Sequence, residues 1–87
     1  MVKVRLAALL HSYTSGVPVV EAEGGTLAEV MDSLDRSYPG LAFRVVDEQG
    51  MVRPHMSVFV GSERVRDPLV PVGPRQEIFI VGALSGG

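Results

Sequence analysis

The most distinctive chemical group in this sequence is the α-carboxylate of Gly87. The last three residues are Ser85, Gly86 and Gly87, and they follow the strand-like run 77–81. Glycine has no Cβ, so the backbone at Gly86 and Gly87 fits a slot too narrow for other residues. Residues 82–87, fully extended, would reach roughly 20 Å from that run. We therefore expect an arm that delivers a carboxylate into another protein's active site; the alternative is an inert chain end.

No other group of residues has the spacing of a catalytic or metal-binding site. The sequence contains no cysteine, which excludes disulfides, thiolate catalysis and cysteine-ligated metals. His11 and His55 lack the HxH or HxxxH spacing of metal ligands. Asp47 and Glu48 are adjacent acids in a predicted turn, and Ser85 has no histidine placed to activate it. We predict a protein that is not an enzyme by itself and binds no metal or cofactor.

The composition indicates one small domain in the cytoplasm. Among 87 residues, 46% are hydrophobic, which suffices for a single core. A net charge of −2 without a basic stripe argues against a nucleic-acid partner. No apolar run is long enough to span a membrane, and we find no signal-peptide pattern. A single lysine, Lys3, and the absence of cysteine would leave few internal nucleophiles to attack an activated acyl group at Gly87.

The first half of the sequence predicts two strands and a helix. Alternating apolar residues over 2–10 predict the first strand, and residues 17–22, after a polar turn, predict the second. The run 26–29 matches a capping box at the start of an amphipathic helix that stops at Pro39 and Gly40. The apolar stripe of this helix consists of Leu27, Val30, Met31 and Leu34.

The second half predicts strands over 56–60, 63–66 and 77–81, with a possible extended segment at 43–46. A last strand that follows a long loop can pair beside the first strand. We therefore predict an α+β, β-grasp (ubiquitin-like) fold, with a mixed four- to five-stranded sheet and one main helix packed on one face. Residues 1–81 form the predicted domain, and residues 82–87 form a predicted flexible tail.

Side-chain alternation predicts an apolar patch on the sheet face that the helix does not cover. Arg5, Ser57 and Glu77 mark the outward positions of three strands. By this alternation the outward apolar residues are Ala7, Leu9, Phe59, Phe79 and Val81. The predicted core positions are Val4, Leu6, Val58, Val60, Ile78 and Ile80. Such a patch is typical of a docking surface, unless segment 41–55 or a homodimer covers it.

Taken together, these features resemble the MoaD/ThiS family of ubiquitin-like sulfur carriers. The resemblance rests on the strand order, Tyr38-Pro39-Gly40-Leu41, Val58-Phe59-Val60-Gly61 and Gly86-Gly87. The long segment through residues 43–48 indicates the MoaD-like branch. The run Arg53-Pro54-His55 resembles the carriers that feed cysteine synthesis.

The resemblance implies a mechanism centred on Gly87. An E1-like enzyme of the MoeB/ThiF type would use ATP and Mg²⁺ to adenylate the Gly87 carboxylate, and sulfur would then replace AMP to leave a thiocarboxylate. Gly86 and Gly87 would enter the active sites of the activating enzyme and of a sulfur-acceptor enzyme. The partner-binding residues implied are Phe59, Arg64, Phe79, Val81, Leu84 and Ser85. The family's acidic turn before the last strand is replaced by residues 72–77, which leaves the partner's identity open.

Three alternatives stay open at this point. The chain could be the small subunit of molybdopterin synthase, a protein modifier joined to lysines as ubiquitin is, or a non-covalent β-grasp interaction module. The sulfur acceptor is also open: a pterin precursor, a thiazole precursor, an activated serine or a secondary-metabolite sugar. The sequence does not determine the oligomeric state.

Overall fold

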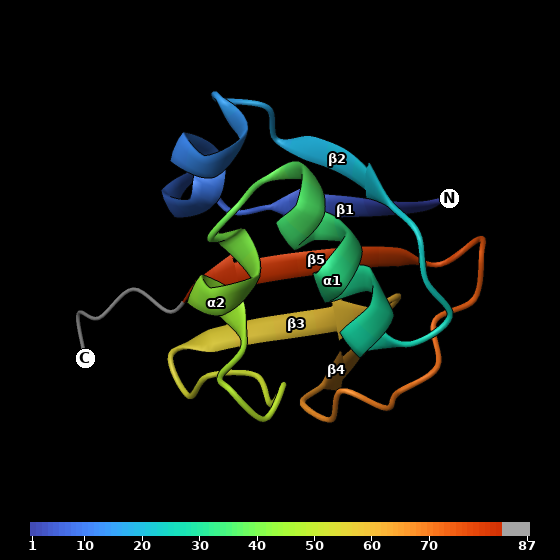
Figure 1. The fold of residues 1–87 in the computed structure, drawn as a ribbon. Coiled ribbons are helices and arrows are strands. Elements are labelled where there is room, and N and C mark those ends of the chain that lie inside the picture. The colour runs from blue at the N-terminus through green and yellow to red at the C-terminus, as the bar shows by residue number, and fades with distance from the viewer. Residues whose placement is uncertain (83–87) are drawn as a thin grey trace.

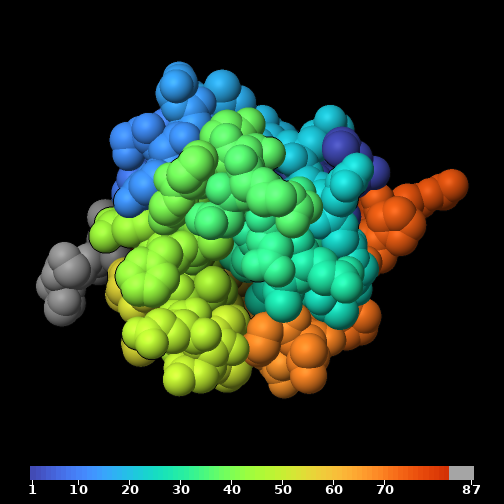
Figure 2. Space-filling model, in the orientation of Figure 1, coloured from blue at the N-terminus to red at the C-terminus, as the bar shows by residue number. Residues whose placement is uncertain are grey.

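A computed structural model describes residues 1–82 as one sheet with its helices packed on one face (Figure 1). The strands are β1 (Val2–Leu6), β2 (Val19–Ala22), β3 (Met56–Val60), β4 (Glu63–Val65) and β5 (Glu77–Gly82). The helices are the 3₁₀ helix η1 (Ala8–Thr14), α1 (Leu27–Ser37) and α2 (Leu41–Val45). Figure 2 shows the helical face, with residues of α1 and α2 at its centre.

The five strands lie in the order β2-β1-β5-β3-β4. β5 is parallel to β1 and antiparallel to β3, so the last strand of the chain occupies the centre of the sheet. β1 and β2 form an antiparallel pair, as do β3 and β4. This mixed sheet with a helix across one face is the β-grasp arrangement. The predicted fold class is therefore confirmed.

Helix α1 begins where the sequence predicts and buries the predicted stripe. The Thr26 hydroxyl accepts a hydrogen bond from the Glu29 amide at 3.3 Å, which satisfies one unpaired N–H of the first turn. The Glu29 carboxylate accepts a hydrogen bond from the amide of Gly25, at 2.7 Å. In a standard capping box it would accept from the amide of Thr26 instead. The buried residues of α1 are Leu27, Val30, Met31 and Leu34. Burial of this stripe holds α1 on the sheet.

The predicted core positions of the three central strands are all buried. They are Val4, Leu6, Val58, Val60, Ile78 and Ile80. Leu10 of η1 and Leu41 of α2 belong to the same hydrophobic cluster and reach it from the two short helices. The predicted core positions on β1, β3 and β5 are therefore confirmed.

The prediction of an extended segment at 43–46 was wrong, because residues 41–45 form helix α2. Leu41 and Val45 are one helical turn apart and both fully buried, while Phe43 is exposed. Gly40 has a φ of 93°, a conformation that glycine adopts without strain, and it reverses the chain between α1 and α2. Only Val46 is extended, in an isolated bridge with Val52.

The first strand is shorter than predicted. β1 ends at Leu6, and residues 8–14 form η1 where the sequence predicts strand and turn. The Ala7 amide still donates a hydrogen bond to the Ile80 carbonyl of β5. The Leu10 amide then donates to the Ala7 carbonyl, which begins the 3₁₀ helix. Leu10 reaches the core from η1 and not from a strand. The assignment of Ala7 and Leu9 to the outward face of β1 was therefore wrong.

Strand β5 extends through Gly82, one residue past the predicted boundary of the domain. Residues 83–87 lie outside the described residues, so the predicted tail stays a prediction. Within residues 1–82, no helix combines the length and the hydropathy needed to cross a membrane.

Candidate functional site

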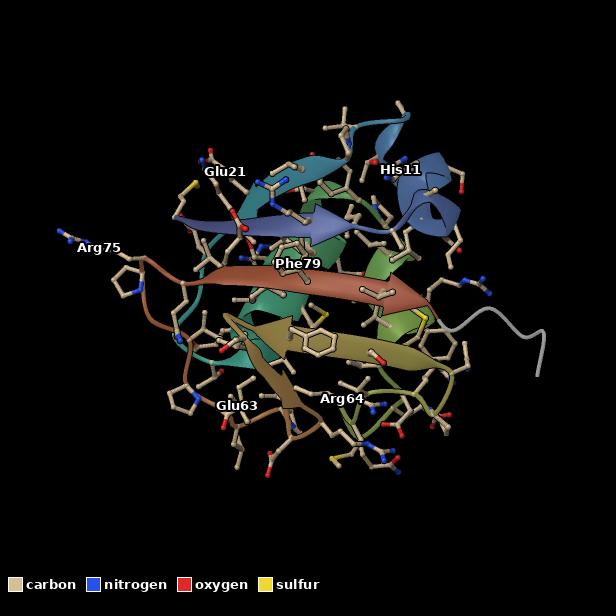
Figure 3. All side chains as sticks on the ribbon, turned by 180° about the vertical axis from the view of Figure 1, so that it is seen from behind. His11, Glu21, Glu63, Arg64, Arg75 and Phe79 are labelled. Carbon is tan, nitrogen blue, oxygen red and sulfur yellow. The ribbon has the colours of Figure 1, made fainter. Side chains whose placement is uncertain are left out.

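An apolar surface lies on the sheet face opposite α1. Phe79 and Val81 of β5 are 38% and 43% exposed, and Phe59 of β3 is partly exposed. The register pairs Phe59 with Phe79 and Ser57 with Val81, so these side chains are neighbours on one face. Phe79 lies at the middle of this face in Figure 3. We call Phe59, Phe79 and Val81 the outer-face patch; their predicted outward orientation is confirmed.

An arginine side chain flanks the outer-face patch on each side. On β1, the Arg5 Nε lies 2.9 Å from the Glu77 carboxylate, and its guanidinium lies 5.8 Å from the centre of the Phe79 ring. On β4, the exposed Arg64 is the register partner of Phe59 (Figure 3). An exposed ion pair adds little stability, typically ~0–1 kcal/mol. Its effect here is to fix Arg5 beside Phe79.

A shallow hollow of ≈ 360 Å³ lies beside the patch and could receive a partner's side chain. It runs between β1 and β5 and is lined by Arg5, Pro18, Val19, Phe79 and Val81 among others. Apolar side chains dominate this lining. The outer face thus offers a partner both a raised aromatic ring and a recess next to it.

The other polar residues considered from sequence have structural roles or lie apart. The His11 Nε2 lies 2.9 Å from a backbone carbonyl at the end of β1. One carboxylate oxygen of Asp47 accepts from the amides of Gln49 and Met51, so Asp47 shapes its own turn. His55 is exposed at the start of β3. Over residues 1–82, no cluster of three histidine, cysteine or acidic side chains is arranged to hold a metal ion.

Four predicted site residues lie outside the described residues: Leu84, Ser85, Gly86 and Gly87. Their roles therefore stay predictions. The structure does show the last strand position before them, Gly82, whose register partner is Met56 of β3. A Cβ on Gly82 would collide with the side chain of Leu9. Leu9 thus leans from η1 over the end of β5, a contact that strand alternation could not predict.

No family model matches the chain, but individual proteins do. The chain is 28% identical to sulfur carrier protein CysO of Mycobacterium tuberculosis over 91 residues, which cover 99% of this chain and 98% of CysO. It superposes on the Amycolatopsis orientalis BexX/CysO complex structure with a TM-score of 0.93, at 29% identity and with 100% of both chains covered. Over its full length the chain resembles CysO, a ubiquitin-like sulfur carrier.

A third match concerns the fold alone. Small archaeal modifier protein 1 of Methanosarcina acetivorans superposes with a TM-score of 0.80, at 23% identity, over 99% of this chain and 95% of that protein.

The resemblance to MoaD/ThiS-type carriers, and within them to the cysteine-synthesis type, is confirmed by the two CysO matches. The matched relative is named as a carrier protein, which agrees with the prediction that this chain is not an enzyme by itself.

Proposed function

We propose that this carrier transports sulfur as a thiocarboxylate on Gly87. The likeness to CysO carries the proposal, because it extends over 99% of this chain and 98% of CysO, and over 100% of the matched chain in the BexX/CysO complex. The described domain adds support, since it presents the exposed outer-face patch for contact with a partner.

The chemistry requires an activating partner because a carboxylate is a poor electrophile. An E1-like enzyme of the MoeB/ThiF type transfers AMP from ATP to the Gly87 carboxylate, with Mg²⁺ and release of pyrophosphate. Sulfide attacks the acyl-adenylate carbonyl, the carbon–sulfur bond forms, and the bond to AMP breaks. A persulfide can supply the sulfur when a thiol reductant cleaves the resulting acyl disulfide. Gly86 and Gly87 present no Cβ to the narrow active sites they enter.

The carrier docks its partners through the outer-face patch. Exposed aromatic residues with an arginine beside them are the composition typical of binding hot spots. Phe59, Phe79 and Val81 supply the apolar contacts, and Arg64 supplies a charge at the rim. Leu84 and Ser85 contact the partner as the tail enters. The A. orientalis CysO relative is found in a complex with BexX, which supports an enzyme partner for this chain as well.

Intact-mass spectrometry tests the proposal directly. The carrier is incubated with ATP, Mg²⁺, a cognate activating enzyme and sulfide. We expect its mass to rise by the difference between a sulfur and an oxygen atom, with the change located on Gly87, and no rise when ATP is omitted. An unchanged mass, with an activating enzyme shown to be active on another carrier, contradicts the proposal.

Docking through the outer-face patch predicts a binding defect without a folding defect. Phe79→Glu should raise the KM for the carrier in the activation reaction roughly tenfold or more, the size of a hot-spot loss. The thermal midpoint should change little, because Phe79 is 38% exposed. Leu69→Glu places the same charge on a 75% exposed leucine in the loop before β5 and is the matched control. Equal KM values for the two variants would refute docking at Phe79.

A further inference from the structure

A second surface feature, separate from the outer-face patch, lies between α2 and the start of β3. It is a recess of ≈ 240 Å³ lined by Phe43, Arg44, Arg53 and His55. We call these four residues the cationic notch. Two of them are arginines, and a third, His55, carries an imidazole that can form hydrogen bonds. Phe43 is 58% exposed, so an aromatic ring stands open to solvent among these groups.

Arg53 is held in a fixed position inside the notch. Its Nε donates to the Phe43 carbonyl at 2.8 Å, and its guanidinium lies 4.5 Å from the centre of the Phe43 ring. Within residues 1–82, the Nε is the only guanidinium atom of Arg53 with a hydrogen bond to protein. The two remaining nitrogens therefore present a planar, oriented pair of donors. This geometry matches the two oxygens of a carboxylate.

The positive charge in the notch is not neutralised by the described part of the protein. The ion pair found within residues 1–82 joins Arg5 to Glu77, on the outer face of the sheet. Asp47, the acid nearest to the notch in sequence, uses its carboxylate to accept amides of its own turn. The whole chain has a net charge of −2, so the notch concentrates charge that the rest of the surface does not share. Such a local excess attracts an anionic partner.

The notch lies at the end of the sheet where β5 stops. His55 precedes Met56, and Met56 is the register partner of Gly82, the last described residue. Figure 1 shows α2 at this same end of the sheet, on the helical face. The outer-face patch lies on the other face. A partner that receives the residues following Gly82 approaches this end and has both surfaces within reach.

We propose that the cationic notch binds a carboxylate-bearing, acidic segment of the activating enzyme. The choice of that enzyme rests on the proposed function; the preference for protein carboxylates rests on the notch itself. Two arginines and a histidine in one recess suit one or two carboxylates, whereas a nucleic acid requires an extended basic stripe. The exposed Phe43 ring adds apolar contact beside Arg53, a combination that protein interfaces favour. The notch speeds and orients docking, and the outer-face patch provides most of the contact area.

A titration without any enzyme tests the preference of the notch. An oligoglutamate peptide is added to ¹⁵N-labelled carrier, with sodium chloride at matched ionic strength as the reference. We expect saturable shifts of the Arg53 Nε–H and His55 signals, and none at Arg75, an exposed arginine at the opposite end of β5 (Figure 3). Shifts no larger than the salt reference, or equal at Arg75, overturn the proposal. Larger notch shifts with a single-stranded oligonucleotide of equal charge also overturn it, in favour of a nucleic acid.

Enzyme kinetics test the role in docking. Arg44→Gln removes an exposed charge, and Arg53→Lys keeps the charge but loses the paired donors. Each should raise the carrier's KM with the activating enzyme about fivefold, with kcat unchanged. Arg75→Gln removes the same charge away from the notch and should leave KM unchanged. Because the Arg44 side chain is exposed and makes no hydrogen bond or ion pair within residues 1–82, its variant remains decisive even if Arg53→Lys folds poorly.

The outcomes separate this inference from the proposed function. If the wild-type carrier gains sulfur and neither notch variant changes KM, the notch proposal is wrong and the thiocarboxylate proposal stands. If the wild-type carrier gains no sulfur with an active enzyme, the thiocarboxylate proposal is wrong. The peptide titration then still decides whether the notch binds carboxylates.

Discussion

One alanine added after Gly87 should abolish thiocarboxylate formation. The added residue moves the terminal carboxylate by roughly 3.5 Å and places a Cβ where the proposed reaction needs none. A misplacement of about 1 Å in an active site can cost roughly 10²-fold in rate, so the extended carrier should react more than about 10²-fold slower. Single-turnover formation of the thiocarboxylate, followed by intact-mass spectrometry, measures the difference.

The extended carrier also provides its own control. Its thermal midpoint should equal that of the wild type, because the described domain ends its last strand at Gly82 and the change lies at Gly87. Ala83→Ser alters the tail at constant length, at a position with no proposed partner contact, and should keep most of the rate. Removal of the extra alanine by a carboxypeptidase should restore the reaction. Sulfur loading at the wild-type rate on protein whose mass still includes the alanine would rule out a terminal thiocarboxylate.

The sheet was predictable because its strands carry clear markers. Arg5 and Glu77 occupy outward positions of β1 and β5, and in the structure they form an ion pair across these strands. Each marker fixes the orientation of its neighbours, since side chains alternate along a strand. Phe79 could therefore be assigned to the outer face from sequence, and the buried Ile78 and Ile80 to the core.

The short helices were not predictable from the same pattern. α2 spans only Leu41–Val45, too short to show a helical period, and the adjacent Val45 and Val46 are β-branched residues that favour strands. The helix forms because Leu41 and Val45 both reach the core. In η1, Leu10 continues the apolar alternation of β1 by coincidence, since it is buried from a 3₁₀ helix. In both segments, burial of side chains in the core determines that the backbone is helical.

The candidate site also contains a part that the sequence predicts and a part that only the structure reveals. Gly86 and Gly87 were identified from residue type and resemblance, and they lie outside the described residues. The cationic notch has no sequence signature, because Phe43 and Arg53 are separated by ten positions and meet only when α2 forms. The hydrogen bond from Arg53 Nε to the Phe43 carbonyl joins the two sides of the notch, and it exists only in the folded chain.

Gly24→Ala should destabilise the domain by about 3 kcal/mol, the sum of backbone strain and overpacking. Gly24 has a φ of 149°, which alanine rarely adopts. A Cβ there would lie 2.7 Å from the Val30 nitrogen and 2.8 Å from the Glu29 carbonyl carbon. These backbone atoms belong to the first turn of α1. They cannot retreat without disturbing the Thr26 cap, which bonds the Glu29 amide, and the bond from the Val30 amide to the Thr26 carbonyl at 3.0 Å.

Variants at two other glycines, Gly25 and Gly16, separate the contributions of backbone strain and overpacking to this loss of stability. At Gly25, a Cβ would have the Glu29 carboxylate at 3.5 Å as its nearest neighbour, so Gly25→Ala should change stability by less than about 0.5 kcal/mol. At Gly16, with a φ of 88° and nothing within 4 Å, alanine adds strain alone, about 1 kcal/mol. Urea denaturation of the three variants measures the differences. If Gly24→Ala loses no more than Gly16→Ala, the close approach of the β2–α1 connection to the helix is not what requires glycine at this position.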